Sequence, residues 1–120
     1  MSKLLVHIVT GPENPTRGAL ALLVARTAVA AGHEVTLFLA GDGVGYLREA
    51  TMDVSHGIGT GSVREHYTAL ADAGVPVYAS GMSSKARGLD ASAFGGKAIE
   101  LAPPDKLVEL IMEADRVVTY

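Results

Sequence analysis

Short apolar runs recur along the chain, and most of them end in glycine, proline or small polar residues. Unbroken runs of branched and long apolar residues are typical of strands that are buried on both faces of a parallel sheet. The pattern predicts strands at Lys3–Val9, Val35–Leu39, Val75–Ala79, Lys97–Leu101 and Arg116–Tyr120.

Helical spacing of apolar residues separates these runs. Asn14 and Pro15 suit the start of a helix that continues to about Ala31, and Ser62 with Glu65 forms a capping box for another. Helices are predicted from Pro15 to Ala31, Val44 to Ala50, Ser62 to Gly74, in part of Lys85 to Ala93, and from Pro103 to Ala114 with Leu107, Leu110, Ile111 and Ala114 on its buried face. Alternating strands and helices predict one α/β domain, residues 1–120, with helices on both sides of a parallel sheet.

The segment Met52–Gly61 is the least regular part of the chain. Its glycines 57, 59 and 61 give the pattern GxGxG. No predicted strand leads into this pattern, which argues against a dinucleotide site. We expect a mobile loop or an intersubunit contact here.

Composition limits the possible partners. Hydrophobic residues make up 48% of the 120 residues and charged residues 19%, so we expect partner subunits to cover some apolar surface. The net charge of −3 gives no basic surface for nucleic acid or an anionic membrane. The start does not resemble a signal peptide, and the apolar stretch Gly18–Gly32 is shorter than the roughly 20 residues of a membrane span. A soluble cytoplasmic protein is predicted.

The chain contains no cysteine. This excludes a thiolate nucleophile, a persulfide carrier and a cysteine metal site within the chain. His56 and His66 have irregular spacing and no third ligand, so neither a metal nor a cofactor is predicted. His7, inside the first strand, is expected to be a buried or half-buried histidine that a neighbour satisfies.

Polar residues follow the third predicted strand, where a parallel sheet presents its ligand crevice. Hydroxyls, backbone N–H groups and a guanidinium near a helix N-terminus suit a small anion such as a carboxylate, phosphate or sulfur oxyanion. The candidate ligand-binding residues are Ser80, Gly81, Met82, Ser83, Ser84 and Arg87, with Asp42, Glu13 and Arg17 around the rim. The alternatives are that the serines only cap a short helix and that Met82 fills the core.

Four segments in this order resemble the DsrE/DsrF-like family, which includes the YchN-like proteins. They are the Gly-Pro-Glu loop at 11–13, the alanine-rich helix leading into GHEV at 32–35, VYASGMSSKARGL at 77–89 and EADRVVTY at 113–120. The resemblance covers nearly the whole chain. It implies a three-layer α/β/α sandwich around a five-stranded parallel sheet, assembly as a trimer or hexamer, and a relation to sulfur-relay proteins.

The chain departs from this family at Ser80, where the sulfur-handling members carry cysteine. Serine has a far higher pKa than cysteine and forms no stable persulfide, so Ser80 cannot carry sulfur. The resemblance then implies an oligomeric subunit that binds a small anion or interacts with a sulfur-relay partner protein. One alternative is a sulfur carrier or sulfurtransferase, if Ser80 is an engineered replacement for cysteine. A less favoured one is a hydrolase that uses Ser80 with His56 or His66 and Asp42, although the chain lacks the G-x-S-x-G nucleophile elbow there.

Overall fold

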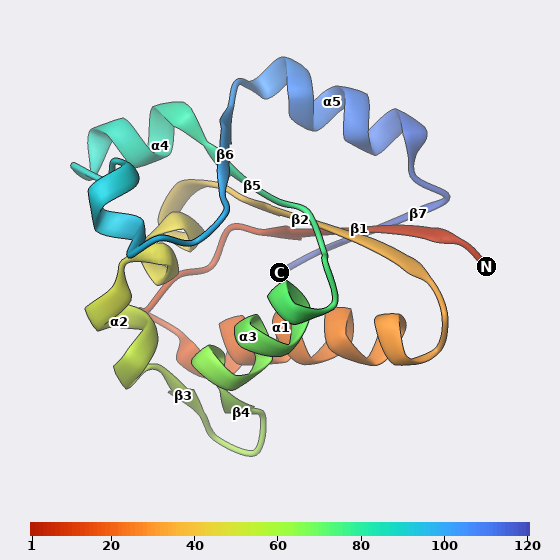
Figure 1. The fold of residues 1–120 in the computed structure, drawn as a ribbon, viewed down its shortest axis with the longest axis horizontal. Coiled ribbons are helices and arrows are strands. Elements are labelled where there is room, and N and C mark those ends of the chain that lie inside the picture. Colours follow the sequence, from red (N-terminus) through yellow and green to blue (C-terminus); the bar gives the residue numbers. More distant parts are fainter.

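The computed structural model describes residues 1–120 and contains a five-stranded sheet in which all neighbouring strands are parallel (Figure 1). The strand order is β6-β5-β2-β1-β7. The strands are β1 Lys3–Ile8, β2 Glu34–Leu39, β5 Val77–Ser80, β6 Glu100–Ala102 and β7 Arg116–Thr119. The predicted α/β class and five-stranded parallel sheet are confirmed.

Helices flank both faces of the sheet, which gives three layers. Figure 1 shows α1 (Pro15–Ala30) and α3 (Val63–Asp72) on one side, and α4 (Gly81–Ala86) and α5 (Pro104–Glu113) on the other. The remaining helical segments are two 3-10 helices, η1 (Gly41–Leu47) and η2 (Ala91–Phe94), and the short helix α2 (Glu49–Val54). No helix is long and apolar enough to span a bilayer.

Local sequence signals set the ends of the main helices. The Asn14 side chain accepts a hydrogen bond from Arg17 N at 3.1 Å at the start of α1, and Ser62 accepts one from Glu65 N at 3.2 Å at the start of α3. These bonds satisfy backbone N–H groups that a helix leaves without an internal partner. Gly32, with φ +89°, follows α1 as the C-terminal signal predicts.

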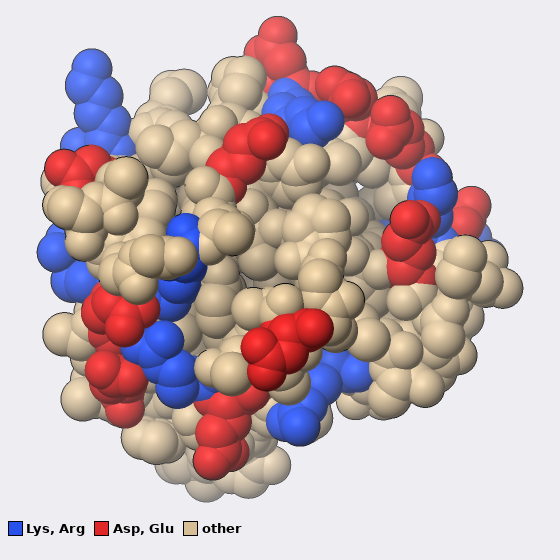
Figure 2. All heavy atoms as spheres, in the orientation of Figure 1, with Lys and Arg blue, Asp and Glu red and all other residues tan.

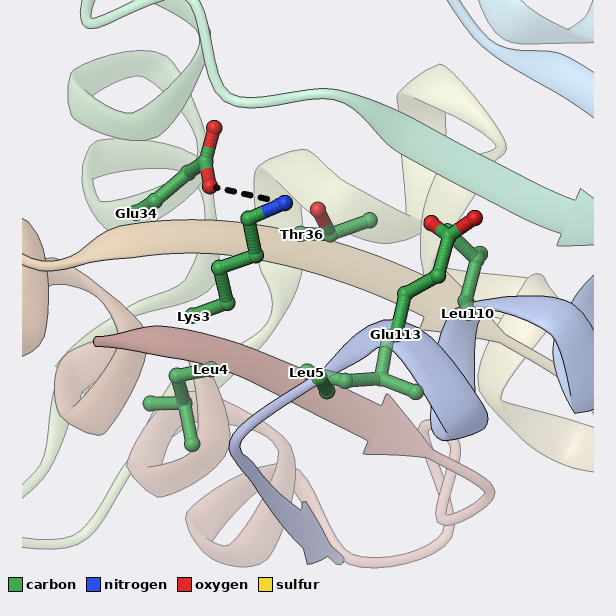
Figure 3. Close-up of a pocket in the computed structure, with 8 residues that line it drawn as sticks. Lys3, Leu4, Leu5, Glu34, Thr36, Leu110 and Glu113 are labelled. Atoms are coloured by element: carbon green, nitrogen blue, oxygen red, sulfur yellow. Dashed lines mark ion pairs between the residues drawn. The ribbon is translucent and has the colours of Figure 1, made fainter.

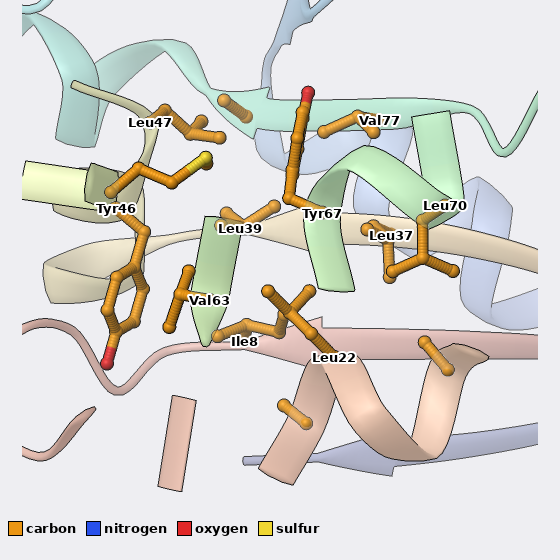
Figure 4. Close-up of a cluster of buried hydrophobic side chains, with 14 of the residues drawn as sticks. Ile8, Leu22, Leu37, Leu39, Tyr46, Leu47, Val63, Tyr67, Leu70 and Val77 are labelled. Carbon is orange, nitrogen blue, oxygen red and sulfur yellow. The ribbon is translucent and has the colours of Figure 1, made fainter. Parts of the chain in front are cut away.

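The two faces of the sheet differ in the number of buried residues that pack against them. The main core has 20 buried residues and includes the side chains of α1, α3 and the sheet shown in Figure 4. On the opposite side, a cluster of only three buried residues, Leu5, Phe38 and Ala102, packs against half-buried side chains of α5. No residue of α5 is fully buried, and Ile111, predicted to lie on its buried face, is 37% exposed.

Several predicted boundaries were wrong. The strand predicted at Val75–Ala79 begins two residues later, because Val75 N donates to Leu70 O and closes α3. The helix predicted within Lys85–Ala93 is instead α4 and ends before Gly88, whose φ is +66°. The segment Lys97–Ile99 precedes β6 rather than belonging to it.

The segments around α2 are also more regular than predicted. The helix expected over Val44–Ala50 is divided between η1 and α2. The segment Met52–Gly61 holds the end of α2 and most of an antiparallel hairpin formed by β3 (His56–Gly57) and β4 (Gly61–Ser62). Gly59 and Gly61 have positive φ angles of +75° and +87°, which the tight turn of this hairpin requires. The turn therefore accounts for these two glycines, and no nucleotide-binding loop is needed to explain them.

Charged residues are spread over the surface. Figure 2 shows blue and red groups interspersed around the margin of one face, with an uncharged centre. The 10 Lys and Arg residues and 13 Asp and Glu residues therefore form no basic stripe on this face.

Candidate functional site

The predicted site begins where β5 ends. Ser80 is the last residue of β5 and the N-cap of α4, and its Oγ accepts a hydrogen bond from Ser83 N at 3.1 Å. A serine in this position satisfies a free N–H group of the first helical turn. The structure therefore supports the alternative that Ser80 caps a short helix.

Arg87 joins this turn to the loop that follows β2. Its Nη2 lies 2.7 Å from Asp42 Oδ1, and its Nη1 donates to Ser83 O at 3.1 Å. The Ser83 hydroxyl accepts a hydrogen bond from Gly41 N at 2.9 Å. Four of the predicted residues, Ser80, Ser83, Arg87 and Asp42, thus form one cluster at the carboxyl ends of β2 and β5.

The charge of Arg87 already has a partner in this cluster. The side chains of Arg87 and Asp42 are 36% and 63% exposed, so the ion pair lies at the surface and contributes little to stability. An incoming anion would compete with the Asp42 carboxylate for the guanidinium.

Two of the predicted ligand-binding residues, Ser84 and Met82, are not oriented as the sequence analysis expected. The Ser84 side chain is fully buried and its Oγ has no hydrogen-bond partner, so it cannot contact a ligand at the surface. Met82 is 70% exposed, so the alternative that it fills the core was wrong. Because α4 starts at Gly81, Ser84 points inward and Met82 outward.

Glu13 and Arg17 belong to the loop after β1 and the start of α1. Glu13 Oε1 accepts a hydrogen bond from Gly11 N at 2.8 Å. The guanidinium of Arg17 lies 5.8 Å from the centre of the Tyr120 ring, a cation–π distance. Their observed contacts are therefore within this loop and with the end of the chain, rather than with Ser80 or Arg87.

His7 lacks the neighbour that was expected to satisfy it. Its Nε2 is buried without a hydrogen-bond partner, and burial lowers the pKa of the imidazole below its ordinary value. The ring of Phe38, its register partner on β2, forms a T-shaped pair with the imidazole, with 6.1 Å between the ring centroids. The sequence offered no signal for this environment, since it depends on the pairing of β1 with β2.

His66 supplies no catalytic base for Ser80. Its Nε2 lies 2.7 Å from Thr60 O, a carbonyl that can only accept, so Nε2 carries the proton. Nδ1 then accepts from Arg26 Nη1 at 3.4 Å. Both ring nitrogens are engaged beside α1, and the Ser80 hydroxyl contacts Ser83 N instead of a histidine.

A separate hollow of about 150 Å³ lies at the opposite, amino ends of β1 and β2. Figure 3 shows Lys3 and Glu34 from neighbouring strands and Glu113 from α5 around it, with Lys3 Nζ 3.8 Å from Glu34 Oε2. Leu5, Thr36 and Leu110 also line it. No group of three His, Cys, Asp or Glu side chains is close enough to hold a metal ion.

Comparison with known proteins gives a family and a fold. The model of the DsrE/DsrF-like family matches residues 3–120. The crystal structure of the YchN protein from E. coli is similar over 100% of both chains, with a TM-score of 0.79 and 18% sequence identity. A conserved protein of unknown function from Bacteroides thetaiotaomicron is similar over 99% of this chain and 95% of its own, with a TM-score of 0.74 and 15% identity. No curated protein matches the chain.

Proposed function

Because the chain belongs to the DsrE/DsrF-like family, we propose that it is a homo-oligomeric interaction subunit related to sulfur-relay proteins. Family membership supports the relation to sulfur relay. The family resemblance implies that Ser80 stands where sulfur-handling members carry cysteine, and the chain contains no cysteine. Without a cysteine the chain cannot carry sulfur as a persulfide. Its role in sulfur relay is therefore to bind other subunits or a partner protein that carries the sulfur.

The observation that carries this proposal is the thin cover on one face of the sheet. A parallel sheet is normally buried on both faces. Here α5 covers its side without a single fully buried residue, and Val108, Ile111 and Met112 on α5 are 57%, 37% and 80% exposed. Val117 on the edge strand β7 is 39% exposed. We name Val108, Ile111, Met112 and Val117 the α5 surface, and propose that neighbouring subunits cover it.

Native mass spectrometry tests the proposal. The wild-type chain is expected as a trimer or hexamer, and Val108→Glu is expected to reduce the subunit number because a charge in the centre of an interface is costly. Met82→Glu, at a 70% exposed position on α4, is the matched control and should leave the assembly unchanged. A wild-type monomer at micromolar concentration would overturn the proposal.

The same spectra address the alternative of a sulfur carrier. Protein from its own host should have the subunit mass of the sequence with Ser80. A subunit heavier by the difference between cysteine and serine, or by an added sulfur atom, would instead support a sulfur carrier or sulfurtransferase.

A small-anion site is the second candidate function, and the convergence of Ser80, Ser83 and Arg87 at the sheet rim favours it. Inorganic sulfate and phosphate are suitable probes in isothermal titration calorimetry. Arg87→Ala should weaken their binding about tenfold or more and leave the oligomer intact, because a charge-assisted contact of about 1.5–3 kcal/mol is lost.

Asp42→Asn provides the opposite change at the same site. Removing the carboxylate that pairs with Arg87 should strengthen sulfate binding several-fold, since the guanidinium no longer has a competing anion. Lys85→Ala, a nearby basic position, is the control. Binding that responds to neither Arg87→Ala nor Asp42→Asn would exclude this site.

A further inference from the structure

The hollow at the amino ends of β1 and β2 is separate from both surfaces proposed above. It lies between these two strands and the C-terminal end of α5, and its volume is about 150 Å³ (Figure 3). It contains none of the residues of the α5 surface. It is also at the opposite end of the sheet from Ser80, so a ligand in this hollow leaves the anion site free.

Half of the residues around the hollow are apolar. Leu5 of β1 is 1% exposed, and Leu110 and Ala114 at the end of α5 pack against the small cluster to which Leu5 belongs. The hollow has room for on the order of five water-sized groups. A short aliphatic chain fits this space and gains free energy by leaving water.

The charged side chains of the hollow leave one carboxylate without a partner. Lys3 Nζ lies 3.8 Å from Glu34 Oε2, whereas Glu113 takes part in none of the ion pairs of the structure. In Figure 3 the carboxylate of Glu113 points from α5 toward Thr36 of β2. One lysine and two glutamates give the lining a formal net charge of −1, which favours a cation.

The end of α5 adds to this negative potential. The last carbonyl groups of a helix have no internal partner and carry a partial negative charge, which cations stabilise. The last turn of α5 contains no basic residue, and its final residue is the acidic Glu113. The helix terminus and the free carboxylate therefore favour a positive ligand at the same point.

We propose that the hollow binds a small primary amine in its protonated form. The ammonium group lies between Glu113 and Thr36, and the aliphatic chain lies against Leu5 and Leu110. An ammonium group has three N–H donors, and carboxylate and hydroxyl oxygens accept them. A primary alkylamine is protonated at pH 7, as the lysine side chain is. A metal ion is a poorer occupant, because no group of three His, Cys, Asp or Glu side chains surrounds the hollow.

An NMR titration of isotope-labelled protein with n-butylammonium chloride tests the inference. The backbone amide signals of Thr36 and Ala114 should shift and saturate at millimolar concentration. Butanol and sodium butyrate have the same chain without the positive charge, and they should shift these signals much less. Ethylammonium should bind more weakly, by up to about fourfold for each buried CH₂ that it lacks. Equal shifts with butanol and butylammonium, or none at Thr36 and Ala114, overturn the inference.

Two variants with opposite expected effects place the ammonium group. Glu113→Gln should weaken butylammonium binding about threefold or more, because the free carboxylate is lost. Lys3→Met should strengthen binding, because it removes a like charge and frees Glu34. Glu109→Gln is the matched control, since Glu109 is on the same helix, pairs with Lys106 at 3.2 Å and does not line the hollow.

All three substituted positions are exposed, so the variants should fold, and the amide spectrum of each free variant checks this. An affinity that is the same in wild type and Glu113→Gln overturns the inference. An equal loss of affinity in Glu113→Gln and Glu109→Gln also overturns it, because the amine then responds to the charge of α5 rather than to the hollow.

Discussion

Tyr46 fixes the approach of η1 to α1 and to the loop that follows β1. Its hydroxyl lies 2.7 Å from Gly11 O and 3.2 Å from Asn14 O, and the residue is 2% exposed. Burial, with a smaller contribution from the charge of Glu13, raises the pKa of Tyr46 to about 12. Gly18 of α1 leaves the space that the Tyr46 ring occupies.

Gly18→Ala should therefore destabilise the protein, although alanine is the better helix former by about 1 kcal/mol. A Cβ at Gly18 would clash with the Tyr46 ring and hydroxyl, which are too buried to move freely. We expect a net loss of about 1–3 kcal/mol in the free energy of unfolding, measured by urea denaturation.

Gly81→Ala is the matched control for this substitution. Gly81 is also helical, but the nearest atom to an added Cβ is Ala102 O at 3.8 Å, an ordinary contact. Its stability should stay within about 0.5 kcal/mol of wild type or increase. A stabilising effect of Gly18→Ala would contradict the packing described here.

At the scale of single residues, the sequence predicts the structural features that depend only on residues nearby in the chain. The caps at Asn14 and Ser62 depend on neighbours three residues away, and both were predicted. Ser84 was placed at the rim because the start of α4 was predicted four residues too late. A shift of that size changes which side chains of a helix point inward, so the orientation of Ser84 and Met82 could not be derived.

Lys97 connects elements that are far apart in the sequence. Its Nζ donates to Leu47 O at 3.3 Å and Phe94 O at 3.1 Å and pairs with Glu49, and its side chain is 6% exposed. Glu49 Oε2 also lies 2.9 Å from Arg64 Nη2. One carboxylate thus joins α2 to α3 and to the segment after η2.

The Glu49 network predicts a pH-dependent part of the stability. Hydrogen bonds from Lys97, and then from Arg64, hold the pKa of Glu49 below its usual value of 4.5. A carboxyl with a depressed pKa in the folded state contributes stability above the unfolded pKa, and this contribution is lost as pH falls through the folded pKa. Glu49→Gln should therefore lower the urea midpoint at pH 7, and its difference from wild type should shrink below about pH 4.5.

Glu113→Gln serves as the control for Glu49→Gln, since Glu113 is an exposed glutamate in none of the ion pairs of the structure. It should change the midpoint little at either pH. A difference between Glu49→Gln and wild type that stays constant from pH 7 to pH 3 would contradict the linkage.

At the scale of elements, the sequence predicts that a strand or helix exists better than where it ends. Lys97 was assigned to the fourth strand because apolar residues follow it. Its actual partner, Glu49, is 48 residues away, and no local pattern signals such a contact. The hairpin in Met52–Gly61 was missed for a similar reason, because Thr16 and His66 hold its turn through hydrogen bonds from outside the segment.

The whole molecule is unequal on its two sides. Twenty buried residues form the main core, whereas three form the cluster under α5. The low content of charged residues predicts that some apolar surface is covered by partners, but it does not indicate which face. The order of the strands likewise cannot be predicted from local sequence patterns, because it depends on long-range pairings such as that of β1 with β7.

The position of β7 has a consequence for biosynthesis. Asp115 and Arg116 bring β7 to β1, where Lys3 N donates to Asp115 Oδ2 across 112 positions of sequence. A ribosome makes β1 first and β7 after every other element described, so one edge of β1 stays open throughout elongation. Unpaired strand edges favour aggregation, and long-range pairings form slowly. The nascent chain therefore passes through a period in which a chaperone that shields the open edge of β1 would raise the yield of folded protein.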